Sequence, residues 1–287
     1  ISIHMKMDVI LFMMMIIYDL IPNLFYSNLG LISRVFSIFI ILTTPFIIYN
    51  VYSMIIKCFT YKEKKPPIKK YIIFDGLIGA GKTTLIKMLV KTMKSKGYKV
   101  KPIFEPVDVW EDAGALKLFY EDIKTHCYEF QTFTYITRIR RLLKEIDLND
   151  DIEYYLIERS IFTDKYVFVE LLKEQMGETR IEMYNIWWNM WEKLIPFKPS
   201  LFVMLDTSVD DSQDRLKIRN RAGEIVSNDY QIKLHKEHHN FYCEIKNKLG
   251  VPSIVIPSSD MKHDYIDNEN HPILEKILDQ IVVSYVL

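Results

Sequence analysis

The chain has 287 residues with 37 basic and 37 acidic side chains, so its formal charge is zero and its isoelectric point is near 7.2. A chain with this balance has no broad basic face, which argues against nucleic acid as a partner. Its three cysteines lie far apart and form no CxxC pair. This spacing argues against a disulfide framework and against a cysteine-based zinc site.

Charge is distributed unevenly along the chain. Only five of the first 60 residues are charged, and six of the 13 methionines lie among them. We therefore expect three parts: a hydrophobic segment at 1–60, a basic linker with prolines at 61–69, and a charged α/β domain at 70–287.

The hydrophobic segment contains 22 consecutive uncharged residues at 35–56. This run is long enough to span a bilayer as a helix, although Pro45 would kink it. The lysines that follow would then place the domain at 70–287 in the cytoplasm, anchored to a membrane. A second interpretation stays open: the chain begins with Ile1, and Met54 could be the natural start of a cytoplasmic protein without this segment.

A phosphate-binding loop follows the first predicted strand, the short apolar run YIIF at 71–74. The sequence GLIGAGKTT at 76–84 matches G-x-x-x-x-G-K-[ST] between a strand and a helix. Its glycines let backbone N–H groups converge on phosphate oxygens at a helix N-terminus. Lys82 would contact the β- and γ-phosphates, and Thr83 would coordinate Mg²⁺. We expect ATP to be bound here by Gly76, Gly79, Ala80, Gly81, Lys82, Thr83 and Thr84.

The sequence predicts three further strands, at 99–104, 154–157 and 201–205. In an open α/β sheet the carboxyl ends of the strands face the ligand crevice. Glu105, after the first of these strands, could accept a proton from a hydroxyl group. Glu158, after the second, could meet a metal ion, and Arg159 could neutralise a phosphoryl group. A solvated loop acid and a structural salt bridge are the competing interpretations.

The helical segment at 130–146 has a polar stripe formed by Gln131, Thr134 and Arg138. An amide side chain such as that of Gln131 can pair bidentately with a base edge. An exposed helix face would show the same pattern.

The segment DRLKIRNRAGE at 214–224 brings Arg215, Arg219 and Arg221 close together. Arginines in such a cluster repel one another unless an anion or acids intervene, so we expect a lid that closes over ATP phosphates. A solvated helix of mixed charge is the alternative.

Five segments in this order resemble the deoxyribonucleoside kinases, the group that contains deoxycytidine, deoxyguanosine and mitochondrial thymidine kinases. They are GLIGAGKTT, EPVDVW, FQTFTYITRIR, ERSIFTDKYVF and DRLKIRNRAGE, and the resemblance covers about 68–249. It implies an α/β P-loop NTPase fold, with a parallel sheet flanked by helices and an arginine-rich lid. It also implies a homodimer that uses ATP and Mg²⁺ to phosphorylate the 5′-hydroxyl of a deoxyribonucleoside in nucleotide salvage.

The resemblance further implies roles for single residues. Glu105 would be the general base, and Glu158 would organise Mg²⁺ with Thr83. Phosphoryl charge would be stabilised by Lys82, Arg159, Arg215 and Arg219. Tyr120 and Glu224 would hold the 3′-hydroxyl. The residues expected around the nucleoside are Glu105, Trp110, Tyr120, Phe130, Gln131, Arg138, Arg159, Asp164, Phe168 and Glu224.

Substrate preference is less defined by the sequence. Arg138 with Asp164 resembles the branch that phosphorylates deoxycytidine and purine deoxynucleosides. Thr134 departs from the family, in which a smaller residue is usual. The segment VPSIVIPSSDMK at 251–262 lacks the usual acidic loop for the donor base, which leaves the preference for ATP open.

Two other functions would use the same loop. A nucleoside-monophosphate kinase would need a second phosphate site. A membrane-tethered P-loop ATPase or switch would use Asp206, at the end of the strand 201–205, as its Walker B acid.

Two aromatic clusters are interpreted structurally. Trp187, Trp188 and Trp191 predict core packing or a dimer face. His235, His238 and His239 do not fit HExxH and have no carboxylate at ligand spacing, so we expect a surface helix.

Overall fold

The computed structural model describes residues 50, 53, 67–148, 150–221, 223–258 and 272–283. The chain divides into two compact units, Ile1–Lys65 and Pro66–Leu287. Most of the predicted span at 35–56 lies outside the described residues. Among the residues that are described, no helix combines the length and the apolar character that crossing a bilayer requires. The predicted boundaries at residues 60 and 70 stay predictions.

A five-stranded parallel sheet forms the centre of the second unit. In space the strands follow the order β2-β3-β1-β4-β5. Their bounds are β1 (Lys70–Gly76), β2 (Val100–Ile103), β3 (Tyr154–Glu158), β4 (Leu201–Asp206) and β5 (Ser253–Pro257). The four predicted strands are confirmed, each boundary within two residues, whereas β5 at the sheet edge was not predicted.

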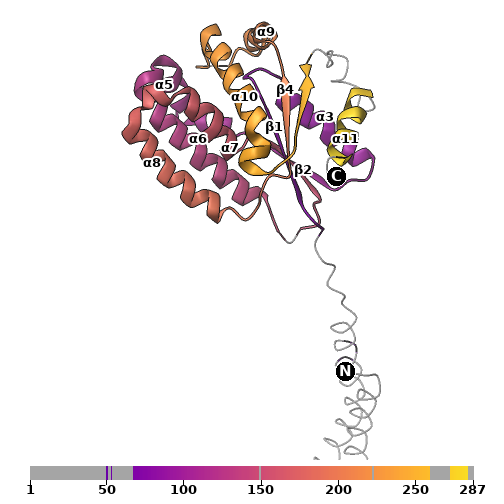
Figure 1. Ribbon diagram of the computed structural model, residues 1–287. Helices are drawn as coiled ribbons and strands as arrows, with labels where there is room; N and C mark the ends of the chain where they lie inside the picture. Colours follow the sequence, from indigo (N-terminus) through magenta and orange to yellow (C-terminus); the bar gives the residue numbers. More distant parts are fainter. Residues whose placement is uncertain are drawn as a thin grey trace, which may run out of the picture. The chain divides into compact units, whose positions relative to one another are not determined.

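The helices lie on both faces of the sheet (Figure 1). One face carries α3 (Lys82–Ser95) and α11 (Pro272–Val283). The other face carries α6 (Ile123–Glu145), α7 (Ile161–Thr163), η1 (Asp164–Val169), a single π-helical stretch, α8 (Lys173–Leu194) and α10 (Asn228–Leu249). Three shorter helices complete the described part of this unit: α4 (Val107–Asp112), α5 (Ala115–Glu121) and α9 (Val209–Arg219).

Burial on both faces explains why the central strands are continuous apolar runs. Ile72, Phe74, Leu156 and Phe202 are fully buried. The predicted α/β fold, with a parallel sheet flanked by helices, is confirmed.

The sheet brings the phosphate-binding loop next to the ends of its neighbouring strands. Phe74 pairs in register with Glu158, and Gly76 pairs with Leu205. Gly76 has a φ of 134°, and a Cβ at this position would lie 2.5 Å from the Leu205 carbonyl oxygen. Only glycine permits both this backbone conformation and this close approach. The loop therefore turns directly from the end of β1 towards the N-terminus of α3.

The three tryptophans on α8 differ in environment. Trp188 is buried, and its Nε1 donates to the Ile161 carbonyl oxygen at 3.1 Å. Trp187 is half exposed. Core packing is confirmed for Trp188 and for Trp191, which is partly buried against the core, while Trp187 belongs to a solvent-facing apolar surface.

Candidate active site

A polar pocket lies at the carboxyl ends of the strands. Its walls come from the phosphate-binding loop, the ends of β2 and β3, the helices α5 and α6, and the segment after α9. All ten residues predicted to surround the nucleoside line it: Glu105, Trp110, Tyr120, Phe130, Gln131, Arg138, Arg159, Asp164, Phe168 and Glu224. The residues that the family resemblance implied thus line one pocket, although the resemblance did not indicate how their side chains pair with one another.

Four of the residues predicted to bind ATP line the same pocket, namely Gly79, Lys82, Thr83 and Arg219. The other five, Gly76, Ala80, Gly81, Thr84 and Arg215, are not among its lining residues. Arg215 instead lies against the loop, where its Nη1 donates to the Ala80 carbonyl oxygen at 2.8 Å. The loop and α9 are thus in direct contact, and Arg219 at the end of α9 lines the pocket.

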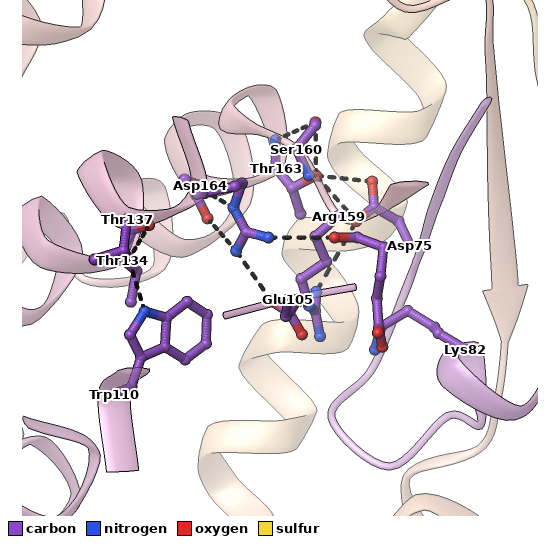
Figure 2. Close-up of polar contacts among 12 residues, drawn as sticks. Asp75, Lys82, Glu105, Trp110, Thr134, Thr137, Arg159, Ser160, Thr163 and Asp164 are labelled. Atoms are coloured by element: carbon purple, nitrogen blue, oxygen red, sulfur yellow. Dashed lines mark hydrogen bonds and ion pairs between the residues drawn. The ribbon is translucent and has the colours of Figure 1, made fainter. Parts of the chain in front are cut away.

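Glu105 is held between two arginines near the centre of the pocket, in the network shown in Figure 2. Its Oε1 accepts a hydrogen bond from Arg138 Nη2 at 3.0 Å and lies 3.3 Å from Arg159 Nε. Burial would raise the pKa of Glu105, but attraction by Arg159 and Arg138 outweighs burial and lowers it to about 2. Glu105 is therefore a carboxylate at neutral pH and can accept a hydrogen bond from a hydroxyl group.

Arg138 also forms a bidentate ion pair with Asp164, the first residue of η1. The two contacts are Nε to Oδ2 at 2.9 Å and Nη2 to Oδ1 at 3.1 Å. Burial raises the pKa of Asp164, and the neighbouring Arg138 partly offsets that effect. A planar guanidinium in this fork geometry fixes the orientation of both side chains. The pair presents a charged donor and a charged acceptor side by side.

Arg159 has an unusual backbone conformation, with a φ of 60°. The left-handed region costs a residue other than glycine about 1–2 kcal/mol. Several contacts hold it there: its N–H donates to the Phe74 carbonyl oxygen at 2.9 Å, and its guanidinium lies 4.8 Å from the centre of the Phe168 ring. Strain that surrounding contacts impose in this way is typical of functional sites.

Asp75, the residue before the phosphate-binding loop, was missed by the sequence analysis. It is fully buried, lies 4.0 Å from Arg159 Nη1, and accepts from the Thr163 hydroxyl at 2.9 Å with each of its oxygens. Burial raises the pKa of Asp75 to about 6, although Arg159 and Thr163 act in the opposite direction. Thr163 in turn forms a capping box with Ser160 at the start of α7. The sequence contained one signal, an acid at a strand end directly before the loop.

The prediction of a surface helix is wrong for His238, which is fully buried. Its Nδ1 lies 2.9 Å from the Leu234 carbonyl oxygen, which only accepts, so Nδ1 carries the hydrogen. Nε2 therefore accepts from Arg159 Nη1 at 3.2 Å. Burial, with Arg159 nearby, lowers the pKa of His238 well below its usual value. The buried positions Leu234, Phe241 and Ile245 follow a helical period that could have placed His238 on this face.

Thr83 and Glu158 form the oxygen-rich corner of the pocket. The Thr83 hydroxyl donates to Glu158 Oε1 at 2.7 Å. A hydroxyl and a carboxylate are suitable ligands for Mg²⁺, which binds oxygen and keeps several waters. Glu158 is thus an acid that contacts the loop through Thr83, whereas Asp206, the proposed Walker B acid of the alternative ATPase, contacts His235 and His239.

Lys82 is buried at the start of α3, and its Nζ donates to the Leu77 carbonyl oxygen at 2.9 Å. Burial and the nearby Arg159 lower the pKa of Lys82 to about 8. Lys82 is thus mainly protonated at neutral pH, with an ammonium group available to phosphate oxygens.

The segment after α9 carries the remaining predicted arginines. Arg219 forms an ion pair with Glu224, and Arg221 lies 3.2 Å from Glu111 and 3.5 Å from Glu224. Tyr120 lines the same part of the pocket, and burial raises its pKa, with Tyr230 and Glu224 adding to the effect. The arginines are therefore neutralised by acids here, and the predicted closure over ATP stays a prediction.

This geometry defines a class of protein: a P-loop phosphotransferase with a buried acceptor pocket. Residues 72–284 match the model of the deoxynucleoside kinase family. The chain belongs to this family.

Several curated proteins are similar to the chain. A probable deoxycytidine kinase of fowlpox virus is 30% identical over 223 residues, which are 76% of this chain and 90% of the viral protein. Deoxyadenosine kinase of Dictyostelium discoideum is 31% identical, over 66% of this chain and 73% of its own. Deoxycytidine kinase 2 of Gallus gallus is 27% identical, over 69% of this chain and 86% of its own.

The family fixes the reaction, which transfers a phosphoryl group from ATP to the 5′-hydroxyl of a deoxynucleoside. The predicted deoxynucleoside kinase is thus confirmed, in preference to the two alternative functions considered from the sequence.

Proposed function

We propose that Glu105 is the group that orients the 5′-hydroxyl and receives its proton. The observation that carries this proposal is the position of its carboxylate, ionised between Arg138 and Arg159 in the pocket that Lys82 also lines. A carboxylate with a pKa of about 2 is a weak base. It would therefore accept a hydrogen bond from the hydroxyl first, and receive the proton as the new P–O bond forms.

The charge that develops on the transferred phosphoryl group would be stabilised by Lys82 and Arg159. Both cations are buried and already positioned by hydrogen bonds to backbone groups or side chains. Preorganised charges of this kind need no rearrangement when the reaction occurs. Arg215 and Arg219 would add to this field from α9 when ATP is bound.

Mg²⁺ would be held by Thr83 and Glu158 together with oxygens of ATP. The metal would neutralise charge on the β- and γ-phosphates. Thr83→Val and Glu158→Gln should each raise the Mg²⁺ concentration required for half-maximal activity, as measured in steady-state assays with ATP held constant. Equal Mg²⁺ dependence in both variants and the unmodified enzyme would contradict this assignment.

The nucleoside would lie with its base near Gln131 and the Arg138–Asp164 pair. A carboxylate accepts readily from an exocyclic amino group, which cytosine and adenine carry and thymine does not. The rings of Trp110, Phe130 and Phe168 would line the base and sugar, and Tyr120 with Glu224 would hold the 3′-hydroxyl. We therefore propose deoxycytidine or a purine deoxynucleoside as the preferred substrate, in agreement with the names of the relatives.

A transfer assay with labelled ATP, Mg²⁺ and each of the four deoxynucleosides tests these roles. We expect labelled monophosphate from deoxycytidine or a purine deoxynucleoside, and much less from thymidine. Glu105→Gln should lower kcat by about 10²–10⁴-fold, because the acceptor loses its proton-accepting carboxylate. The matched control is Glu121→Gln, on the exposed surface of α5. A Glu105→Gln enzyme with an unchanged kcat would refute the role of Glu105.

We also propose that the enzyme is a homodimer. Large apolar side chains are exposed on α6 and α8, which pack against each other. They are Ile136 and Leu143 on α6, and Met183, Ile186, Trp187, Met190 and Leu194 on α8. Grouped exposed apolar residues mark interaction surfaces. A second copy of this chain would cover both helices.

A further inference from the structure

Three potential metal ligands that are not among the lining residues of the pocket lie close together. Asp206 ends β4, while His235 and His239 lie one helical turn apart on α10. Their ligand atoms all lie within 4.8 Å of one another. The Asp206 Oδ1 atom is 3.2 Å from His235 Nε2 and 3.1 Å from His239 Nε2. All three side chains are partly exposed, so an ion from solvent can reach them.

The distances match those expected around a tetrahedral ion. Zn²⁺ binds imidazole nitrogen and carboxylate oxygen at about 2.0–2.2 Å. Two such ligands at a tetrahedral angle are roughly 3.3–3.5 Å apart, close to the observed oxygen–nitrogen separations. Bringing the two imidazoles onto one ion requires only small side-chain rotations, because both already point at the same carboxylate oxygen.

We propose that Asp206, His235 and His239 form a binding site for a borderline divalent cation, with Zn²⁺ as the preferred ion. Two imidazoles at i, i+4 on a helix and one carboxylate supply three ligands and leave a fourth position open to water. Imidazole selects zinc and nickel over magnesium, which takes oxygen ligands. The site is therefore chemically distinct from the corner formed by Thr83 and Glu158.

The position of the site suggests what the ion does. Asp206 lies two residues before Ser208, the N-cap of α9, and His235 lies in α10, after the arginine-containing segment. One ion thus joins the two ends of the segment 207–234, which contains Arg215 and Arg219. Figure 1 shows α9 near the upper ends of β4 and α10. A bound ion would fix the base of this segment against the sheet and restrict its movement.

Without a metal, the same contacts would be two ordinary hydrogen bonds from imidazole to carboxylate. Calorimetric titration of the nucleotide-free, full-length enzyme with Zn²⁺ separates the two cases. We expect one high-affinity Zn²⁺ per chain, with no displacement by excess Mg²⁺. Loss of outer-shell partners weakens metal binding about 10–100-fold, so loss of a ligand in Asp206→Asn, His235→Asn or His239→Asn should weaken it more than about tenfold.

Two control variants define where the ion binds. His126→Asn removes a histidine on α6, and Glu158→Gln alters the proposed Mg²⁺ corner, so both should bind Zn²⁺ as the unmodified enzyme does. Zn²⁺ should also raise the Tm of the unmodified enzyme, but not that of Asp206→Asn, because the ion binds the folded state. Failure of the unmodified enzyme to bind Zn²⁺ would overturn the site and leave the kinase assignment intact. Binding by Asp206→Asn and His239→Asn as tight as that of the unmodified enzyme would have the same consequence.

Discussion

Arg159 depends on its neighbours for its position, since its left-handed backbone is unfavourable for a residue with a Cβ. His238 supports it by accepting a hydrogen bond through Nε2, in a tautomer fixed by the Leu234 carbonyl group. His238 is thus a positioning residue that acts through Arg159. It belongs to α10, far in sequence from every strand end that carries a predicted catalytic group.

Replacement of His238 by Leu should therefore lower kcat by roughly tenfold to a hundredfold, because a displacement of about 1 Å in an active site can cost this much. The KM for ATP should change little. His238→Gln, whose amide oxygen can still accept from Arg159, should recover part of the rate. Steady-state kinetics of the two variants checks this, and an equal loss in both would show that His238 serves packing alone.

Asp75 should give the stability of the protein a distinctive pH dependence. Its pKa is raised to about 6 in the folded protein, whereas in an unfolded chain it returns to about 3.9. The folded state then binds more protons between these values, so the free energy of unfolding falls as pH rises from about 4 to 6. The total decrease in the free energy of unfolding is up to about 3 kcal/mol. It is complete above about pH 6 and does not change further with pH.

Urea denaturation of the unmodified enzyme and of Asp75→Asn at a series of pH values isolates this effect. The unmodified protein minus the variant should show a difference that declines through the window from pH 4 to 6. The stabilisation by Glu105, whose pKa is lowered, is lost as pH falls below about 4.5 in both proteins, so the subtraction removes it. A difference that is independent of pH would mean that the pKa of Asp75 is not raised.

At the scale of elements, the phosphate-binding loop and α9 form one closely packed unit. Gly79 has a φ of 89°, and a Cβ there would lie 2.7 Å from the Ser212 carbonyl oxygen on α9. Gly97 has a φ of 86°, with no atom within 4 Å of a Cβ. The two glycines therefore share a conformation and differ in their surroundings.

Gly97→Ala should cost only the conformational term, about 1–2 kcal/mol. Gly79→Ala should cost about 1–3 kcal/mol more, since the methyl group forces α9 away from the loop. It should also raise the KM for ATP, which Gly97→Ala should not. Urea denaturation and ATP kinetics measure both effects. Equal stability losses in the two variants would show that contact between the loop and α9 is unimportant.

The elements that could be predicted from the sequence are those in which local pattern and burial agree. The three central strands, β1, β3 and β4, are largely apolar runs. Glu105 after β2, and Glu158 with Arg159 at the end of β3, mark the pocket. The edge strand β5 is different, because it is partly exposed, follows Pro252 and ends at Pro257. Its pairing partner β4 is distant in sequence, so no local pattern reveals it.

The missed site residues have a similar explanation. Asp75 is connected to the site by its hydrogen bond with Thr163, 88 residues away in sequence. His238 is connected by its hydrogen bond with Arg159, 79 residues away. The sequence gives the type of each side chain, but tertiary packing decides which partner it meets. The Asp206 cluster depends on the same kind of distant contact.

At the scale of the whole molecule, the exposed apolar surface of α6 and α8 predicts that the enzyme is dimeric. Ile186 is 63% exposed on α8, and Ile218 is 84% exposed on α9. Ile186→Glu should place a charge within the dimer interface and give monomers, whereas Ile218→Glu should leave the dimer intact. Sedimentation velocity at micromolar concentration distinguishes the two results. Monomers of the unmodified enzyme would rule out this interface.

The buried charges of the pocket are paired with one another, as Glu105 is with Arg138 and Arg159. A nucleoside that binds as proposed would have to replace some of these ion pairs with its own hydrogen bonds, so the charges alone would add little to its affinity. A molecule without matching donors and acceptors would leave ionised groups deprived of both water and partners, which is costly. The enzyme should consequently reject analogues that lack a single hydroxyl or amino group far more strongly than analogues that differ only in apolar size.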